Sequence, residues 1–249
     1  MISKLKSRVR RWQELRIKGN HGYCSICERR VYFEIQGPWL RDQYKCNTCN
    51  SIPRWRALMS VLAELYPKWR ELTIHESSPG GPLSDKLARD CPGYLASHFF
   101  PGSACGQVHR GFRCEDLMAQ TFDDASFDLV ITSDVFEHLP DVGSAVREIM
   151  RTLRPGGAHV FTVPWFRTKK TLVRALLSDG VLQHLEQPDY HGNPIDESGS
   201  LVFTEWGMEL PFLLQHWGEV PVIIHTIRDR SLGIDGEFRE VFVQQKPYG

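Results

Sequence analysis

The stretch Phe127–Pro164, FDLVITSDVFEHLPDVGSAVREIMRTLRPGGAHVFTVP, carries the pattern that decides the fold. It begins with an apolar run at Asp128–Ser133, which is rich in β-branched residues and too short for an independent helix. After a polar segment, Val142–Leu153 places its apolar residues at helical spacing. The glycine turn at Arg154–Gly157 ends this helix before a second apolar strand at Ala158–Val163. This order predicts a parallel β-α-β unit with a right-handed crossover.

Polar side chains follow the first of these strands, and a proline–tryptophan pair follows the second. They are Ser133, Asp134, Phe136, Glu137 and His138 after the first strand, and Pro164 and Trp165 after the second. Ligands of open parallel sheets bind beyond the carboxyl ends of the strands. The sequence therefore predicts a ligand site at this edge.

Length and composition indicate one α/β domain of ordinary size with a small appendage. The chain has 249 residues, of which 41% are hydrophobic and 24% charged, as in a soluble globular protein. Thirty basic residues balance thirty acidic ones, so the overall charge does not favour nucleic-acid binding. No apolar run approaches the roughly 18 residues of a membrane span, and no apolar segment of a signal peptide follows the basic N-terminus. We expect a cytoplasmic protein.

The N-terminus is strongly basic. Residues 1–18 contain seven lysines and arginines against Glu14 alone, a net charge of +6. We predict a basic helix over residues 1–20. Three roles remain open for it: a solvated helix, a contact with an anionic surface such as RNA, a phosphorylated ligand or a membrane, and a subunit contact in a homodimer.

Four cysteines form two C-x-x-C pairs with eighteen residues between the pairs. They are Cys24, Cys27, Cys46 and Cys49. This spacing is typical of a structural zinc site, in which four thiolates leave no open coordination position. Two disulfides are the alternative, which a cytosolic location disfavours. We predict a zinc-ribbon module over residues 21–53, with a β-ribbon between the pairs, and a connecting helix over residues 54–71.

A glycine turn follows the first strand expected after this helix. That strand, Leu72–His75, ends at Glu76, and the turn Ser77–Pro82 leads into a helix. Strand, acidic residue, glycine turn and helix make the first ligand loop of a Rossmann-type domain. The next strand, Gly93–Ser97, ends at His98, where nucleotide-binding sheets hold ribose hydroxyls with a carboxylate. An imidazole can also hydrogen-bond a hydroxyl.

A candidate third strand at Gly111–Cys114 ends in Glu115-Asp116-Leu117. A carboxylate there can accept a hydrogen bond from an exocyclic amine, and the backbone N–H of Leu117 can donate to a ring nitrogen.

The sequence resembles the class I S-adenosylmethionine (SAM)-dependent methyltransferases of the type 11 group. The resemblance rests on five successive motifs: Glu76-x-Ser78-x-Gly80, Glu115-Asp116-Leu117, Ser126-Phe127-Asp128, Glu137-His138 and Leu153-Arg-Pro-Gly-Gly157. It covers residues 72–165 and, more loosely, 204–246. It implies a Rossmann-like, seven-stranded α/β sheet with a final antiparallel hairpin, in a domain over residues 72–249. In the first motif, Ser78 and Pro82 stand where the family has glycines.

The resemblance also implies a set of SAM contacts. These are Glu76, Ser78, Gly80, His98, Asp116, Leu117, Asp134 and Phe136. Residues 165–203 stand where the family places a variable substrate cap, and we expect a helix over 168–182 within it. The segment Tyr190–Phe203 is similar to bacterial methyltransferases of glycan and small-molecule biosynthesis, some of which carry a leading four-cysteine module.

Methyl transfer is an in-line displacement, so the protein must align the acceptor and remove its proton. Histidine is the usual base near neutral pH. We rank His191 ahead of His138 as the catalytic base, and we predict Trp165, Tyr190 and Asn193 as substrate contacts. The expected acceptor is a hydroxyl or amine of a small molecule or glycan precursor. The alternatives are an RNA methyltransferase that uses the zinc module and a non-catalytic scaffold.

Overall fold

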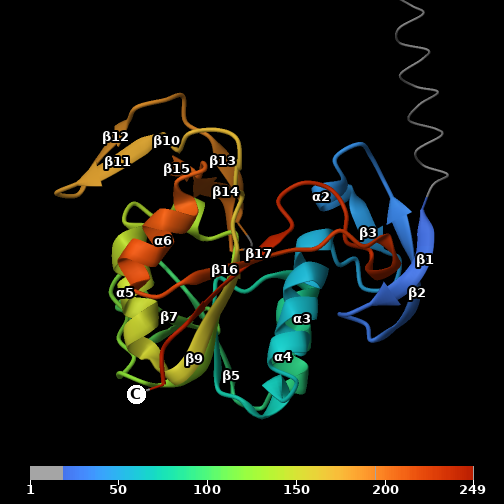
Figure 1. Ribbon diagram of the computed structural model, residues 1–249. Helices are drawn as coiled ribbons and strands as arrows, with labels where there is room; N and C mark the ends of the chain where they lie inside the picture. The colour runs from blue at the N-terminus through green and yellow to red at the C-terminus, as the bar shows by residue number, and fades with distance from the viewer. Residues whose placement is uncertain (1–18, 194, 249) are drawn as a thin grey trace, which may run out of the picture.

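The computed structural model describes residues 19–193 and 195–248 (Figure 1). The basic segment over residues 1–18 lies outside the described residues. Among the described residues the first element is strand β1, which begins at Asn20.

A mixed sheet of eight strands forms the centre of the protein, in the order β16-β17-β9-β8-β4-β5-β7-β6. The strands are β16 (Val222–Thr226), β17 (Glu240–Gln245), β9 (Leu153–Thr162), β8 (Phe127–Ser133), β4 (Ile74–Ser77), β5 (Tyr94–His98), β7 (Phe112–Cys114) and β6 (Val108–His109). The five from β9 to β7 are parallel, and β17 and β16 complete the sheet as an antiparallel hairpin. The predicted Rossmann-like sheet is confirmed, with the two-residue strand β6 added at one edge.

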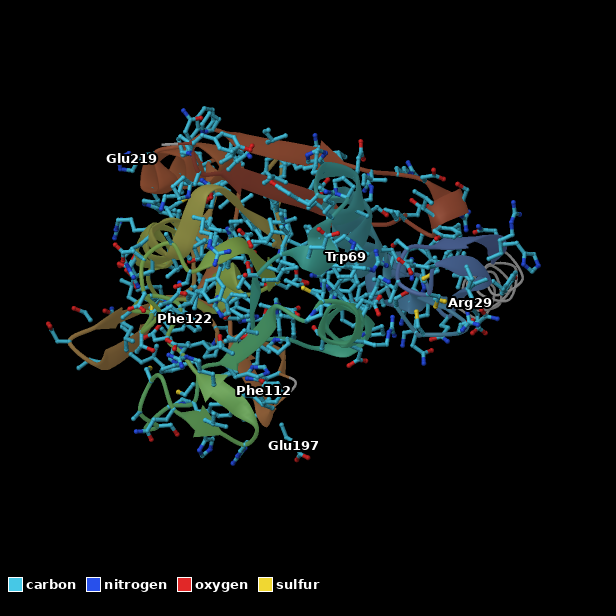
Figure 2. All side chains as sticks on the ribbon, turned by 90° about the horizontal axis from the view of Figure 1, so that it is seen from below. Arg29, Trp69, Phe112, Phe122, Glu197 and Glu219 are labelled. Atoms are coloured by element: carbon cyan, nitrogen blue, oxygen red, sulfur yellow. The ribbon has the colours of Figure 1, made fainter. Side chains whose placement is uncertain are left out.

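Two layers of helices cover the sheet (Figure 1). Helices α3 (Pro53–Leu65) and α4 (Gly81–Asp90) pack on one face, and α5 (Val142–Thr152) and α6 (Leu210–Gly218) on the other. Trp69, in the 3₁₀ turn η1 (Trp69–Glu71), is 1% exposed within the first layer (Figure 2). No helix in the described part of the chain is long and apolar enough to cross a membrane.

The β8–α5–β9 unit follows the predicted pattern closely. Asp141 caps α5 by accepting a hydrogen bond of 3.0 Å from the backbone of Ser144, which stabilises the helix start. The difference lies in β9, which begins at Leu153 rather than at residue 158. The glycine turn is part of this strand as an irregular stretch, because pairing jumps from Phe127–Leu153 to Leu129–Ala158.

The N-terminal module, residues 19–52, shares its core with the main domain. It contains β1 (Asn20–Cys24), β2 (Arg29–Ile35), the short helix α2 (Leu40–Gln43) and β3 (Tyr44–Cys46). Its sheet confirms the expected β-ribbon, although α2 replaces the extended chain at 40–43. Phe33 lies against Gly233, where an added Cβ would come within 2.5 Å of the ring. The loop between β16 and β17 therefore clasps this module.

The expected helix over residues 168–182 is wrong. The cap, residues 165–203, contains short strands instead: β10 (Leu172–Val173), β11 (Ala175–Ser178), β12 (Val181–His184), β13 (Tyr190–Asn193) and β14 (Asp196–Leu201), with β15 (Thr204–Glu205) after it. Asp179 and Gly180 join β11 to β12 with φ angles of 50° and 76°. An Asp-Gly pair with two positive φ angles is the two-residue hairpin turn, and it prevents a helix here.

Candidate active site at the carboxyl edge of the sheet

A cavity of about 1470 Å³ lies at the carboxyl ends of β4, β5 and β8. Its walls come from the strand ends, the loop after β5, the cap and the N-terminal module. The module and the start of α3 contribute Trp39, Arg41, Asp42, Arg54 and Trp55. Sequence reasoning missed this wall, because nothing in the local pattern shows that the module folds over the strand ends.

The cavity gathers five of the eight residues predicted to contact the cofactor. Those that line it are Glu76, Ser78, Gly80, His98 and Asp134. The other three are not among the lining residues: Asp116 accepts a hydrogen bond of 2.9 Å from the backbone of Met118, and Leu117 and Phe136 are buried in the core. Their proposed contacts with the cofactor stay predictions.

Glu76 is the penultimate residue of strand β4 and is 2% exposed. Its carboxylate accepts hydrogen bonds from the Tyr94 hydroxyl at 2.5 Å and from the Ser84 hydroxyl at 2.8 Å. Burial outweighs these bonds and raises the pKa of Glu76 to about 7. The hydrogen bonds fix the carboxylate at the start of the glycine turn.

The turn after β4 keeps a glycine-like backbone conformation at Ser78, which stands where the family has a glycine. Ser78 has φ of 57°, in the left-handed region that favours glycine. Gly81 has φ of 74°, and an added Cβ there would lie 2.5 Å from the Trp55 ring. The indole of α3 thus packs directly on the turn, which explains why Gly81 is needed.

His98 ends strand β5 at the position predicted to hold a ribose. The residue is 2% exposed, and burial lowers its pKa to about 4, so the imidazole is neutral at physiological pH. Its Nε2 atom has no hydrogen-bond partner among the described residues. A buried polar atom at a cavity wall is suited to bind a ligand hydroxyl.

Asp134 follows β8 with φ of 55°, and its carboxylate faces two arginines of the module wall. Arg41 donates to Oδ2, Arg54 Nε lies 2.9 Å from the same oxygen, and the Thr162 hydroxyl donates to Oδ1 at 3.0 Å. Burial opposes ionisation, but Arg54 and Arg41 outweigh it and lower the pKa of Asp134. This residue therefore fastens the module to the sheet edge.

Glu137, His138 and His191 meet on the cap side of the cavity. The cap is fixed to the 3₁₀ turn η2 (Phe136–His138) because Phe203 donates its backbone N–H to the carbonyl of Glu137 at 2.8 Å. This contact brings His191 from β13 to within 3.8 Å of the Glu137 carboxylate. The nearby Glu137 carboxylate raises the pKa of His191, although burial acts in the opposite direction.

Of the predicted substrate contacts, Asn193 lines the cavity. Tyr190 is 55% exposed and is not part of the lining. Trp165 also lies off the lining, where its Nε1 donates to the carbonyl of Gly207 at 2.8 Å and its ring packs on Phe242. The structure thus brings both predicted catalytic histidines together with one of the three predicted substrate contacts.

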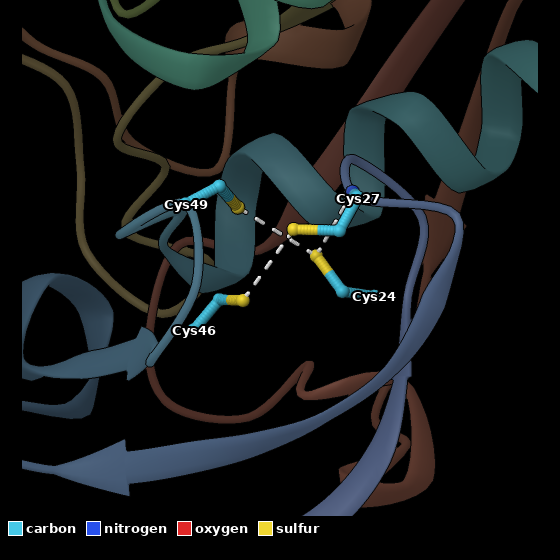
Figure 3. A group of neighbouring side chains, drawn as sticks. All are labelled: Cys24, Cys27, Cys46 and Cys49. Atoms are coloured by element: carbon cyan, nitrogen blue, oxygen red, sulfur yellow. Dashed lines mark hydrogen bonds between the residues drawn. The ribbon is translucent and has the colours of Figure 1, made fainter.

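The four cysteines of the N-terminal module form a compact cluster (Figure 3). Sγ of Cys24 lies 3.9 Å from that of Cys49, and Sγ of Cys27 lies 3.7 Å from that of Cys46. All four are free thiols, so the disulfide alternative is not realised. Tetrahedral zinc with Zn–S bonds of about 2.3 Å would hold its sulfurs about 3.8 Å apart. The donor set and spacing therefore fit one zinc ion.

The sheet order places the two-strand hairpin β16–β17 after five parallel strands, and residues 101–161 match the family model described as a methyltransferase domain. The chain carries a class I SAM-dependent methyltransferase domain. The match covers the strand-end residues Ser133, Asp134, Glu137 and His138 of the cavity.

The chain is similar in sequence to two curated methyltransferases. The chain is 30% identical over 103 residues to the sarcosine/dimethylglycine N-methyltransferase of Halorhodospira halochloris, which is 40% of this chain and 36% of that protein. It is 39% identical over 90 residues to the chloroplastic tocopherol O-methyltransferase of Arabidopsis thaliana, 33% of this chain and 26% of that one. The chain spans about a third of the length of these relatives.

Solved structures of methyltransferases are also similar at low identity. The 1,6-didemethyltoxoflavin-N1-methyltransferase of Burkholderia thailandensis has 16% identity and a TM-score of 0.47, with 78% of each chain covered. An S-adenosylmethionine-dependent methyltransferase from Mesorhizobium loti has 15% identity and a TM-score of 0.47, with 76% of this chain and 98% of that one covered.

Proposed function

We propose that this protein transfers a methyl group from SAM to a hydroxyl or amine of a small molecule or glycan precursor. The observation that carries the proposal is the cavity, where the strand-end motifs of the methyltransferase domain face the polar residues of the cap. The curated relatives, named for N-methylation of sarcosine and O-methylation of tocopherol, support a small acceptor.

The residues at the ends of β4 and β5 fit the donor. The turn from Ser78 to Gly81 lines the cavity, and the unpartnered His98 Nε2, also on the cavity wall, is our candidate to bind a ribose hydroxyl. When bound, SAM supplies a methyl carbon that is already electrophilic. The chain's own residues then need to orient the acceptor and accept its proton.

His191 is our candidate for the base, ahead of His138. It lies in the cap beside Asn193, and both line the cavity that the strand ends open into. Two hydrogen bonds fix the Asn193 side chain. Its Nδ2 donates to the Ser200 hydroxyl at 3.0 Å, and its Oδ1 accepts from the backbone N–H of Ile195 at 3.0 Å. A fixed amide beside an imidazole is suited to orient an acceptor group for deprotonation.

We further propose that the four-cysteine cluster holds a structural zinc ion and that the protein is cytoplasmic. Free thiols at zinc-ligand spacing are stable in a reducing compartment. The closed set of four sulfurs leaves no position for a substrate. The zinc would therefore support the cavity wall formed by the module rather than take part in methyl transfer.

Calorimetry with SAM tests the donor assignment. We expect one SAM per chain, and we expect His98→Ala to weaken binding about tenfold, which corresponds to the roughly 1.4 kcal/mol of one hydrogen bond to a buried partner. His109→Ala is the matched control, since His109 lines the cavity from an exposed position. Absence of SAM binding by the folded wild-type protein would overturn the proposed function.

His191→Ala is expected to lower turnover by about 10²- to 10⁴-fold, the usual contribution of a general base, while SAM affinity changes little. Turnover is measured as S-adenosylhomocysteine release in an extract of hydroxylated and amino metabolites, with the methylated product identified by mass. The control is His184→Ala, an exposed histidine in β12 of the same cap. Unchanged turnover in His191→Ala would remove this residue from the role.

A further inference from the structure

A second cluster of metal-ligand side chains lies in the cavity, away from the four cysteines. It consists of one carboxylate and two imidazoles, from Glu137, His138 and His191. One ligand atom from each lies within 4.8 Å of the others. Glu137 Oε1 is 3.8 Å from His138 Nε2 and 3.8 Å from His191 Nδ1.

The Glu137 carboxylate is buried without a hydrogen bond from any described residue. The residue is 2% exposed, and neither carboxylate oxygen has a hydrogen-bond partner among the described residues. The two imidazole nitrogens at 3.8 Å are too far away for hydrogen bonds. Since removing a carboxylate from water costs several kcal/mol unless it is paired, a group that binds both oxygens or bridges them to the histidines would account for this burial.

The hydrogen bond of His138 uses its Nδ1 atom and leaves Nε2, which faces Glu137, available to a metal ion. Its Nδ1 lies 2.9 Å from the backbone carbonyl of Leu201. A carbonyl can only accept, so Nδ1 carries the proton, and in the neutral ring Nε2 presents its lone pair towards Glu137. A metal-binding histidine in proteins almost always donates its other ring N–H in this way.

We propose that Glu137, His138 and His191 bind a divalent transition-metal ion in the active-site cavity. Two imidazoles and a carboxylate suit Mn²⁺, Fe²⁺, Co²⁺ or Zn²⁺, whereas the four thiolates of the N-terminal module select zinc. Ligand bonds of about 2.1 Å place neighbouring ligand atoms about 3.0–3.4 Å apart. The two distances of 3.8 Å from Glu137 to the histidines therefore need to shorten by about 0.4–0.8 Å. His191 lies beside an irregularity in the pairing of β13 with β14, where the backbone is not fixed by a regular ladder.

The surrounding charges permit a cation. Arg41 and Arg54 lie nearby, but both are paired with Asp134, and Arg54 also pairs with Asp42. The two arginines and two aspartates offset each other. The charge of Glu137 is then left to balance the ion.

The site rests on the proposed function and changes its proton step. An acceptor hydroxyl bound to the ion loses its proton to solvent more readily, because the cation stabilises the alkoxide. The alkoxide oxygen then forms the bond to the methyl carbon, and the electrons of the S–C bond return to sulfur, which becomes a neutral thioether. With the ion bound, both histidines are ligands and neither is the base. His191 serves as the base only in the ion-free protein.

Binding of Co²⁺ to the full chain tests the site. The protein is first given one zinc ion per chain to fill the cysteines, and Co²⁺ is then titrated and followed by equilibrium dialysis and visible absorption. We expect one Co²⁺ per chain with the weak absorption of nitrogen and oxygen ligands and without thiolate-to-cobalt charge transfer. Glu137→Gln and His191→Ala should weaken binding by more than the roughly 10- to 100-fold caused by loss of an outer-shell partner.

Two matched variants control for charge and fold. Glu197→Gln removes an exposed carboxylate from the rim of the same cavity, and His184→Ala removes an imidazole from the cap surface; both should bind Co²⁺ as the wild type does. No Co²⁺ uptake, uptake only with a thiolate band, or equal affinity in Glu137→Gln would each overturn the metal site. SAM calorimetry on the same samples keeps the proposals apart, since SAM binding without Co²⁺ uptake refutes the ion alone.

Discussion

Replacing Cys46 with alanine is expected to lower the free energy of unfolding by at least about 5 kcal/mol. Cys46 is fully buried in β3, and with its partners it holds sulfurs at the spacing of a tetrahedral zinc ion. Structural zinc contributes about 10–16 kcal/mol in isolated zinc-finger peptides, because the unfolded chain has no formed site. Loss of one of the four ligands removes a large part of this zinc contribution to the free energy of unfolding. For a chain of this size, about 5 kcal/mol corresponds to a melting temperature lower by about 10–20 °C.

The effect should extend beyond the module. Phe33 and Tyr44 of the module belong to the same buried cluster as Leu129 and Val243 of the sheet. Arg56 of α3 donates to the carbonyls of Tyr44 and Gly233, which links the module to the β16–β17 loop. We therefore expect one cooperative transition at lower temperature, together with weaker SAM binding.

Thermal unfolding and zinc analysis check this prediction. Cys105→Ala is the control, because Cys105 is a free thiol outside the cluster, and it should shift the melting temperature by no more than a few degrees. A chelator should reproduce the loss in the wild type. A metal-free wild-type protein that melts at the same temperature as the zinc-loaded one would contradict the structural zinc site.

The parts of the fold that follow from local patterns could be predicted from the sequence. The β8–α5–β9 unit has a helical repeat between two apolar runs, and the cysteine spacing determines the cluster in the module. The cap could not be predicted in the same way. Its apolar residues Leu176, Leu177 and Val181 are exposed on a hairpin. Their spacing along the sequence therefore does not indicate which side of the segment is buried. The Asp179-Gly180 pair was the available signal for that turn.

The cavity wall from the module was hidden for a different reason. Arg41 and Asp134 are 93 positions apart, and their ion pair exists only once the module has docked. A sequence pattern shows which residues share a helix or strand, but not which surfaces meet. The same holds for Glu137, which in the sequence is one member of a polar turn. Only the folded structure, in which the cap packs against Glu137, shows that its buried carboxylate has no hydrogen-bond partner among the described residues.

Replacing Asp134 with alanine is expected to destabilise the protein by about 3 kcal/mol. The side chains of Arg41 and Arg54 are 9% and 15% exposed; Arg41 donates a hydrogen bond to this carboxylate, and Arg54 forms an ion pair with it. Removing one member of a buried ion pair costs about 3–5 kcal/mol, because a charge stays buried without its partner. Asp42 remains near both arginines, at 3.6 Å from Arg41, which favours the lower end of that range.

Urea unfolding of Asp134→Ala and of a surface control separates this pair from an ordinary salt bridge. Asp124 pairs with Arg151 at 2.8 Å but is 78% exposed, so Asp124→Ala should cost no more than about 1 kcal/mol. Asp134→Ala combined with Arg41→Met should recover part of the loss, because one of the stranded charges is then gone. If Asp134→Ala is as stable as the wild type yet fails to bind SAM, the carboxylate acts on the cofactor and not as the fastening of the module. If Asp134→Ala both loses stability and fails to bind SAM, the ion pairs of Asp134 with Arg41 and Arg54 hold the cavity wall in the position that SAM binding requires.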